Sequence, residues 1–300
     1  QTKTKIETAA VYALDTIKLN KSWELSLGGR FDNMQSEMDQ FTFATNSRAL
    51  LSRTDNLFSY NLGLVYKPAK NGSVYINHGT SFNPSAEALS LTAPTFTLAP
   101  EKNTMYEIGT KWDLFKKRLS TTLAFFRIDK DNARESIDAT TTQLSGKQRV
   151  DGILLQISGK ITEKWNIMAG YTFMNARVTK SIISSSYNNR RLANTPAHSF
   201  SLFTTYKIDS QFEVGGGANF VSERFVSPVV AADPASGTVR NVPSYLTFNL
   251  MAKYQVTPNI TMQLNANNIT NEYYYDQIRG NNAVVPGEGR VLLLSTNIKF

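Results

Sequence analysis

Residues 245–267 read YLTFNLMAKYQVTPNITMQLNAN, and this stretch decides the fold. Apolar side chains occupy every second position from Leu246 to Tyr254, and the alternation starts again at Ile260 after the short interval 257–259. An α-helix would instead repeat its apolar residues three and four positions apart. A period of two over roughly ten residues predicts a β-strand with one apolar and one polar face, so the stretch reads as two strands joined by a turn.

Segments with this alternation recur along the whole chain. We count about thirteen of them, and their length and number are typical of outer-membrane strands. They begin near Ile6, Trp23, Asn56, Ser73, Tyr106, Leu119, Arg149, Trp165, Ala197, Phe212, Tyr245, Ile260 and Arg290. A wall that faces lipid on one side and water on the other requires this pattern in every strand.

The connections between these segments alternate between tight turns and long loops. The tight turns are 20–22, 68–71, 115–117, 162–164, 209–211 and 257–259. The long loops are 38–55, 82–101, 136–147, 178–196, 225–242 and 268–289. A membrane barrel places its tight turns on the periplasmic side and its long loops outside, so the alternation gives each strand a direction. The sequence therefore predicts an all-β fold, a transmembrane antiparallel β-barrel in the outer membrane of a Gram-negative cell.

The last segment, 290–300, ends the chain with an aromatic residue. Leu292, Leu294, Thr296 and Ile298 fall on alternate positions before the terminal Phe300 and continue one lipid-facing row. Such an ending resembles the C-terminal signal that the outer-membrane assembly machinery reads, so we expect the barrel assembly machinery to be a partner. An ordinary amphipathic strand that happens to end in Phe is the alternative, which the dozen similar strands before it disfavour.

The sequence also argues against several kinds of protein. It contains no run of about 18 apolar residues, which excludes a helical membrane span. The two histidines, His78 and His198, are far apart and lack an Asp or Cys cluster with metal-ligand spacing. No G-x-S-x-G sequence is present, so the chain carries no signal for a hydrolase. We expect neither an enzyme nor a metal site.

The net charge of +8 is unevenly distributed along the chain. Acidic residues offset the basic residues of the long loops, which are near neutral. The excess lies at or beside the tight turns, in Lys18, Lys21, Lys67, Lys70, Lys116, Lys117, Arg118, Lys160 and Lys164. This pattern predicts a basic periplasmic rim that faces phospholipid headgroups.

Aromatic residues also gather beside the tight turns. They are Trp23, Trp112, Trp165 and Phe212. Barrels carry girdles of aromatic residues at the membrane interfaces, so we expect these side chains to mark the periplasmic interface rather than a ligand cage.

The strand count and the first residues lead to an expectation about completeness. Single-chain bacterial barrels have an even number of strands, whereas the count here is odd. An outer-membrane protein is also made with a signal peptide, and none is present at Gln1. Together these observations favour a C-terminal portion of a longer protein.

Several motifs resemble the TonB-dependent siderophore receptor family. The longest is 100–114, PEKNTMYEIGTKWDL, which continues through 118–134. Shorter ones are SFNP at 81–84, RVDG at 149–152, NTPAH at 194–198, VPSY at 242–245 and LNANNITN at 264–271. The ending, VPGEGR at 285–290 and onward to Phe300, resembles the catecholate branch of the family. The likeness covers nearly the whole chain.

The resemblance implies a barrel of 22 strands, of which residues 1–300 would be the C-terminal part. It also implies an N-terminal plug domain, a TonB box and first barrel strands that are absent from this sequence. The implied function is outer-membrane, TonB-dependent uptake of ferric siderophores, with catecholates as the expected class. Iron would be carried by the siderophore, so no cofactor is expected in the protein. We expect a monomer whose partners are the ferric siderophore, TonB, outer-membrane lipid and lipopolysaccharide, and no nucleic acid.

Three alternatives remain open on the sequence. A passive porin would share the wall and the loop rhythm, although the family motifs argue against it. A receptor for a hydroxamate siderophore, haem or cobalamin would share the barrel and differ in its loops. An outer-membrane enzyme such as a barrel lipase would need a catalytic signal that the sequence does not offer.

Candidate ligand-binding residues lie in the outer connections. Ferric catecholate complexes are bulky, aromatic and negatively charged, so cationic and aromatic side chains would meet them through charge-assisted hydrogen bonds and cation-π contacts. The candidates are Arg134, then Tyr187 with Arg190 and Arg191, then Tyr274 with Arg279. For each of them, a solvated loop position or a contact to lipopolysaccharide phosphates is the alternative.

Overall fold

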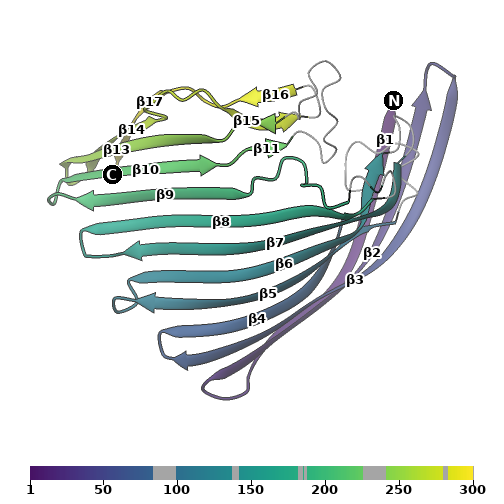
Figure 1. The fold of residues 1–300 in the computed structure, drawn as a ribbon, viewed down its shortest axis with the longest axis horizontal. Coiled ribbons are helices and arrows are strands. Elements are labelled where there is room, and N and C mark those ends of the chain that lie inside the picture. The colour runs from purple at the N-terminus through teal and green to yellow at the C-terminus, as the bar shows by residue number, and fades with distance from the viewer. Residues whose placement is uncertain are drawn as a thin grey trace.

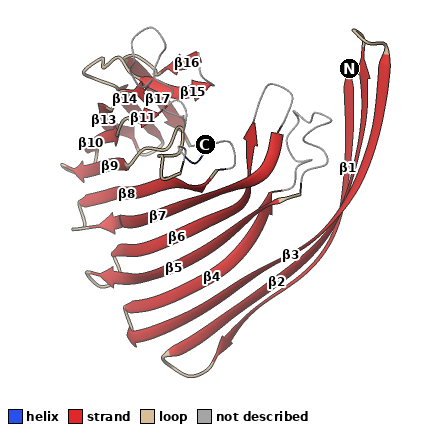
Figure 2. Ribbon diagram, turned by 45° about the vertical axis from the view of Figure 1, so that its right-hand side comes forward, coloured by secondary structure: helices blue, strands red, loops and turns tan. Residues whose placement is uncertain are grey.

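The computed structural model describes residues 1–83, 99–136, 142–181, 185, 188–225, 241–279 and 283–299, without the side chains of 134–136, 142–145 and 279. Within these ranges, thirteen strands form one sheet, which confirms the predicted fold class and number. Every recorded pairing in the sheet is antiparallel. The strands follow one another as a curved wall, in which β1 to β3 bend away at one end (Figures 1 and 2).

The strands of the large sheet are β1 (Thr2–Lys18), β2 (Trp23–Thr42), β3 (Ser47–Ala69), β4 (Gly72–Asn83), β5 (Glu101–Leu114), β6 (Leu119–Ser136), β7 (Thr142–Lys160), β8 (Trp165–Lys180), β9 (His198–Lys207), β10 (Phe212–Val221), β13 (Tyr245–Thr257), β14 (Ile260–Asn267) and β17 (Val291–Ile298). Two small two-stranded sheets pair β11 (Arg224–Phe225) with β12 (Asn241–Val242), and β15 (Tyr275–Arg279) with β16 (Ala283–Pro286). The small sheets lie in the outer connections, opposite the tight turns (Figure 1). Among the described residues, no helix is long and apolar enough to cross a membrane.

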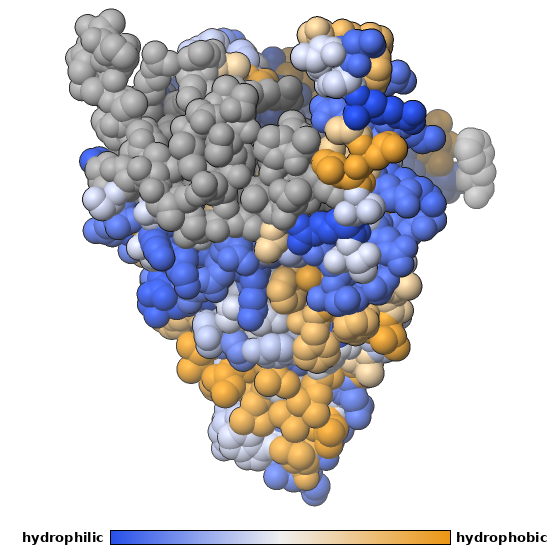
Figure 3. Space-filling model, turned by 90° about the vertical axis from the view of Figure 1, so that its right-hand side faces the viewer, coloured by the Kyte–Doolittle hydropathy of each residue, from blue (hydrophilic) through white to orange (hydrophobic). Residues whose placement is uncertain are grey.

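The register places the apolar residues of neighbouring strands on one face. Ile108 of β5 lies opposite Ile76 on β4 and Phe125 on β6. These three side chains are about half exposed, whereas Ala124, which points the other way, is buried. Figure 3 shows apolar side chains as a zone with hydrophilic residues above and below it. An apolar face that is exposed over many strands is expected where lipid replaces water, so the polar face lines the lumen.

The predicted row at the end of the chain follows the same register. Leu294 of β17 lies opposite Leu264 of β14, and Leu292 lies opposite Ala266. Ile298 pairs with Ile260 in the same row. These three residues therefore share the apolar face, Phe300 lies outside the described residues, and the assembly signal stays a prediction.

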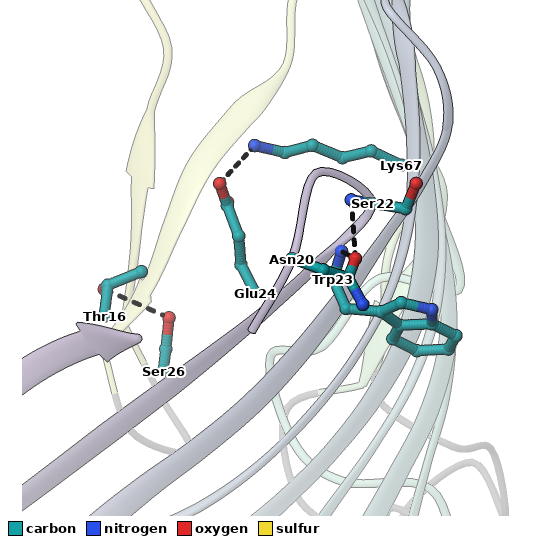
Figure 4. Close-up of polar contacts among 7 residues, drawn as sticks. All are labelled: Thr16, Asn20, Ser22, Trp23, Glu24, Ser26 and Lys67. Atoms are coloured by element: carbon teal, nitrogen blue, oxygen red, sulfur yellow. Dashed lines mark hydrogen bonds and ion pairs between the residues drawn. The ribbon is translucent and has the colours of Figure 1, made fainter. Parts of the chain in front are cut away.

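Four of the six tight turns share one arrangement of hydrogen bonds. The side-chain oxygen of Asn20 accepts hydrogen bonds from the backbone amides of Ser22 and Trp23, at 2.8 and 3.0 Å (Figure 4). Equivalent pairs of bonds are accepted by Thr162, Asp209 and Thr257. Short side-chain acceptors of this kind replace the backbone partners that a chain reversal removes. All six predicted tight turns are confirmed as connections between paired strands.

The predicted long loop 38–55 is wrong. β2 continues to Thr42 and β3 begins at Ser47, so only a short turn separates them. The two strands remain paired throughout, and Arg48 forms an ion pair with Asp39 at 2.6 Å. Here the polar residues Glu37 and Asp39 lie on the outer face, whereas Met38 on the other face is buried, so the hydrophobic alternation no longer follows that of the lipid-facing part while the backbone ladder continues. The loop 136–147 is also shorter than predicted, since β7 begins at Thr142.

The predicted orientation of the basic rim is also wrong in part. Lys67 follows Tyr66, which belongs to the apolar row, so a period of two turns Lys67 to the lumen. It forms an ion pair there with Glu24 at 2.5 Å (Figure 4). Lys18 pairs with Glu24 in the register, and Lys160 pairs with Asn166, on the same lumen-facing side. These three lysines therefore face the lumen and not the phospholipid headgroups.

Candidate functional site

Three outer connections meet at Arg224, the first residue of β11. Its guanidinium donates hydrogen bonds to the carbonyl oxygens of Tyr275 and Asp276, at 2.6 and 2.8 Å. It also donates a longer bond, 3.5 Å, to the side-chain oxygen of Asn194. Arg224 thereby joins the segments that follow β8, β10 and β14. We call this group of contacts the loop junction.

Burial makes Arg224 unusual among the cations of the described residues. Only 6% of its surface is exposed, and its Nε has no hydrogen-bond partner among the described residues. The acceptors that the structure records for Arg224 are carbonyl and amide oxygens rather than a carboxylate. A buried guanidinium is costly to desolvate, so removing it or its acceptors leaves polar groups unsatisfied. The loop junction is thus held together by directional bonds and not by apolar packing alone.

A pair of tyrosines extends the loop junction. The rings of Tyr245 and Tyr274 lie 4.3 Å apart, at an angle of 32°. Burial raises the pKa of the Tyr274 hydroxyl, and the nearby carboxylates of Asp276 and Glu288 act in the same direction. Gly287 lies directly under the Tyr274 ring, because a Cβ at that position would overlap the ring atoms. The phenol is therefore neutral and fixed in place at ordinary pH.

Asn268 holds together the two ends of the outer connection that carries Tyr274. Its side chain, 3% exposed, donates to the carbonyl oxygens of Glu272 and Glu288 and accepts from the amide of Glu272. The connection thus starts and ends at one buried amide group. This clamp fixes the position of Tyr274, which lies between Glu272 and β15.

The structure brings two of the three predicted clusters together. Arg191 lies 3.8 Å from Glu223 and places its guanidinium 5.6 Å from the centre of the Phe225 ring. Glu223 and Phe225 flank Arg224, whose other contacts lead to the segment of Tyr274. Arg190 is exposed, and its carbonyl oxygen accepts a hydrogen bond from the amide of Val178. Members of the second and third clusters therefore share the loop junction.

Of the other predicted residues, the structure describes only the backbones of Arg134 and Arg279. The backbone of Arg134 lies in β6 opposite Leu144, several strands away from β10. The backbone of Arg279 ends β15, opposite Ala283. Tyr187 and the side chains of Arg134 and Arg279 lie outside the described residues. A contact of these three side chains with a ligand stays a prediction.

Sequence reasoning missed Arg224 itself. In the sequence it is one arginine among several in the outer connections, and no local pattern marks it. Its burial and its bonds to a segment 51 residues away appear only in the folded chain. The adjacent Ser222 and Glu223 are ordinary loop residues, so the sequence carries no usable signal for this position.

The aromatic girdle has two levels on the apolar face. Beside the tight turns, Trp23 packs against Tyr66 with ring centres 4.7 Å apart. Nearer the outer end, His78 stacks on Tyr106 and bonds to the hydroxyl of Tyr60. His198 repeats this arrangement with Tyr171. Both histidines thus have structural partners, and no group of three possible metal-binding acids, cysteines or histidines occurs among the described residues.

Comparisons with known proteins agree with this architecture. The family model "TonB dependent receptor-like, beta-barrel" matches residues 1–269. The probable TonB-dependent siderophore receptor PiuA of Acinetobacter baumannii is 35% identical, over 98% of this chain and 41% of its own length. The catecholate siderophore receptor Fiu of Escherichia coli K12 is 30% identical, over 98% of this chain and 42% of its own length. The chain thus spans about two fifths of these curated relatives.

Solved structures show the same fold. The crystal structure of PiuA from Acinetobacter baumannii superposes with a TM-score of 0.90 at 32% identity, over 100% of this chain and 44% of that chain. The closed form of the ferric-catecholate import receptor Fiu superposes with a TM-score of 0.84 at 29% identity, over 100% of this chain and 45% of that chain. The chain belongs to the TonB-dependent receptor-like β-barrel family of the outer membrane.

Proposed function

We propose that this protein takes up ferric siderophores across the outer membrane, with catecholates as the ligand class and TonB as the source of energy. The observation that carries the proposal is the similarity to PiuA and Fiu over nearly the whole chain. Both relatives are named as siderophore receptors. Iron stays with the siderophore, so the protein supplies the recognition and the path.

The loop junction supports a ligand that is both anionic and aromatic. Arg191 is half exposed beside Phe225, and the rings of Tyr245 and Tyr274 form a second aromatic surface. A guanidinium binds negatively charged oxygens through charge-assisted hydrogen bonds, and aromatic faces pack against catechol rings. Arg224 holds the connections that carry these groups in one arrangement.

The proposal is tested by uptake of radioactive iron supplied as a ferric catecholate, in cells that express the full-length receptor with and without TonB. We expect uptake that requires TonB and that excess ferric catecholate, but not a ferric hydroxamate, abolishes. Uptake of a hydroxamate, haem or cobalamin instead would overturn the ligand class. Passage of solutes that is independent of TonB, together with single-channel conductance, would show a porin.

A further inference from the structure

The outer face of β5 to β8 changes from apolar to charged toward the outer ends of these strands. Neighbouring strands carry matching residues at each level, because every pairing among them is antiparallel and in register. Three successive levels are apolar Ile108, Phe125 and Ile153, then Tyr106, Arg127 and Asp151, then Asp129, Arg149 and Arg177. A period of two keeps all of these side chains on the face that meets the membrane and away from the lumen.

The change occurs at the outer aromatic girdle. His78 stacks on Tyr106 with ring centres 4.5 Å apart, and Tyr106 lies directly opposite Arg127. Aromatic girdles mark the interfaces between lipid and water. Arg127 therefore lies at the level of the headgroups of the outer leaflet, and Arg149 and Arg177 lie one level further out. We call these three residues the arginine row.

Two guanidinium groups of the arginine row retain hydrogen-bond donors. Nε of Arg127 donates to Asp151 at 2.6 Å, and Nε of Arg149 donates to Asp129 at 2.6 Å. The side chains of these arginines are 48% and 40% exposed, and no partner among the described residues is recorded for their terminal nitrogens. A guanidinium with free terminal donors can bind a phosphate through two parallel hydrogen bonds.

The third arginine lies where a like charge is unfavourable. Arg177 is directly opposite Arg149 in the register, and like charges in this position destabilise a strand pair. The guanidinium of Arg177 donates to the side-chain oxygen of Asn175 and to the carbonyl oxygen of Asn189, both at 2.7 Å. Within the described ranges, no carboxylate forms an ion pair with Arg177. An anion bound between Arg149 and Arg177 would remove the repulsion.

An apolar groove continues from the arginine row toward the membrane. It has a volume of 840 Å³. Its lining on the outer face includes apolar Leu62, Leu64, Ile76, Ile108 and Phe125, and at its charged end Arg127, Asp129, Arg149 and Asp151. The strands on both sides of β4 to β8 are present, since β3 and β9 complete the wall there (Figure 1). The groove is thus bordered by strands that this chain contains.

The neighbouring strands β2 and β3 lack a charged row at the corresponding place. Beyond Phe31 and Phe58, which lie opposite each other, they carry Asn33 and Asn56. The amide of Asn33 donates a 2.8 Å hydrogen bond to the side-chain oxygen of Asn56. A strand that leaves the membrane therefore does not need charge at this level, and the arginine row is a feature of β6 to β8.

We propose that the arginine row and the apolar groove bind the lipid A part of lipopolysaccharide from the outer leaflet. Its phosphates would contact the guanidinium groups, and its acyl chains would lie on the apolar residues. Lipid A carries more than one phosphate directly above its acyl chains, which matches several arginines directly above an apolar groove. The site lies on the outside of the wall, so the proposal does not depend on which ligand the receptor transports.

Native mass spectrometry of the purified full-length receptor in a nonionic detergent tests the recognition of phosphate. The probes are lipid A, dephosphorylated lipid A and phosphatidylglycerol. We expect lipid A to bind about tenfold more tightly than the dephosphorylated form, because charge-assisted hydrogen bonds are lost without the phosphates. Equal binding of these two probes would overturn the proposal. Binding of phosphatidylglycerol as tight as that of lipid A would overturn the choice of lipid A.

Substitutions test the location of the site in the same assay. Arg149→Gln with Arg177→Gln should weaken binding of lipid A by about tenfold or more. Arg48→Gln is the matched control, because Arg48 also lies on the outer face and pairs with Asp39 at 2.6 Å, but further out on the β2–β3 hairpin. Unchanged binding in the double variant, or an equal loss in Arg48→Gln, would overturn the site.

A single substitution keeps the test decisive if the double variant does not fold. Arg177→Gln removes no ion pair recorded among the described residues, so we expect the receptor to assemble normally, as urea unfolding would verify. It should weaken binding of lipid A severalfold, because one of the three guanidinium groups is lost. Binding as tight as in the unaltered receptor would exclude Arg177 from the site and overturn the arginine row as proposed.

Discussion

The guanidinium of Arg224 donates a 2.6 Å hydrogen bond to the carbonyl oxygen of Tyr275, 51 residues further along the chain. A second donor of the same group reaches the carbonyl oxygen of Asp276. The bonds connect the start of β11 to the start of β15, so they hold two outer connections together. Any ligand surface that includes Tyr274 therefore depends on Arg224, which is buried and which a ligand need not contact.

Replacing Arg224 tests this dependence. Arg224→Met removes the donors and leaves two carbonyl oxygens without their partner, so we expect a loss of about 2–3 kcal/mol in the stability of the loop junction. Hydrogen exchange of the amides in 268–279, measured in the full-length receptor, should report the opening. The control is Arg191→Met, whose half-exposed ion pair contributes about 1 kcal/mol or less. Similar exchange in both variants would contradict the role of Arg224.

The turn residue Asp209 should make stability depend on pH. The backbone amides of Gln211 and Phe212 donate to its carboxylate and hold its pKa below the ordinary value of 3.8. A depressed folded-state pKa gives stability that is fully present above the unfolded-state pKa and is lost as pH falls through the folded-state value. The free energy of unfolding in urea should therefore fall at acid pH more in the unaltered receptor than in Asp209→Asn.

The equivalent turn offers a reciprocal control for this titration. Asn20 accepts the same two amide bonds but does not titrate. Asn20→Asp should therefore add a second contribution of the same sign, visible in urea unfolding as a steeper loss of stability below about pH 4. If neither variant alters the pH dependence, the two amide bonds do not determine the ionisation of these turn residues.

Adjacent leucines of β17 test which face meets lipid. Leu294 lies opposite Leu264 on the apolar face, whereas Leu293 lies opposite Asn265 on the lumen face. Leu294→Lys should destabilise the receptor in lipid vesicles by about 2–4 kcal/mol if it lies near the bilayer midplane, because a charge is placed in hydrocarbon. Leu293→Lys should cost much less, since it meets water. The reverse order in urea unfolding would mean that the two faces are interchanged.

Gly287 tests the packing of the tyrosine pair. Gly287→Ala introduces a Cβ that overlaps the Tyr274 ring, so the ring must move and its contact with Tyr245 is lost. We expect a cost of about 1–3 kcal/mol, the usual range for overpacking, and weaker binding of the ferric complex in an equilibrium assay. Gly289→Ala is the control, because the nearest atom to its Cβ would be 3.4 Å away.

A double-mutant cycle separates packing from backbone effects at this position. Adding Tyr274→Ala to Gly287→Ala removes the overlap, so the two changes together should cost less than the sum of their separate costs. Additive costs would show that Gly287 acts through its backbone and not through the Tyr274 ring.

The alternation of residues was sufficient to predict the wall. Lipid on one side and water on the other impose a period of two on each strand, so 245–267 already specified the β13–β14 hairpin, its turn and its two faces. The same information failed at the outer ends of β2 and β3. There the outer face carries polar residues such as Asp39, which pairs with Arg48, while Met38 is buried on the other face, so the apolar residues no longer follow the lipid-facing row.

Sequence alone therefore determined the strands that cross the membrane, their order, and the side of each turn, because these follow from local periodicity and from the length of each connection. Folding buries Arg224 among three outer connections, and it brings the carbonyl oxygens of Glu272 and Glu288 to the side chain of Asn268. Both arrangements depend on the register between strands and on the packing of segments far apart in the chain. A local pattern of side chains does not encode how segments far apart in the chain pack against one another.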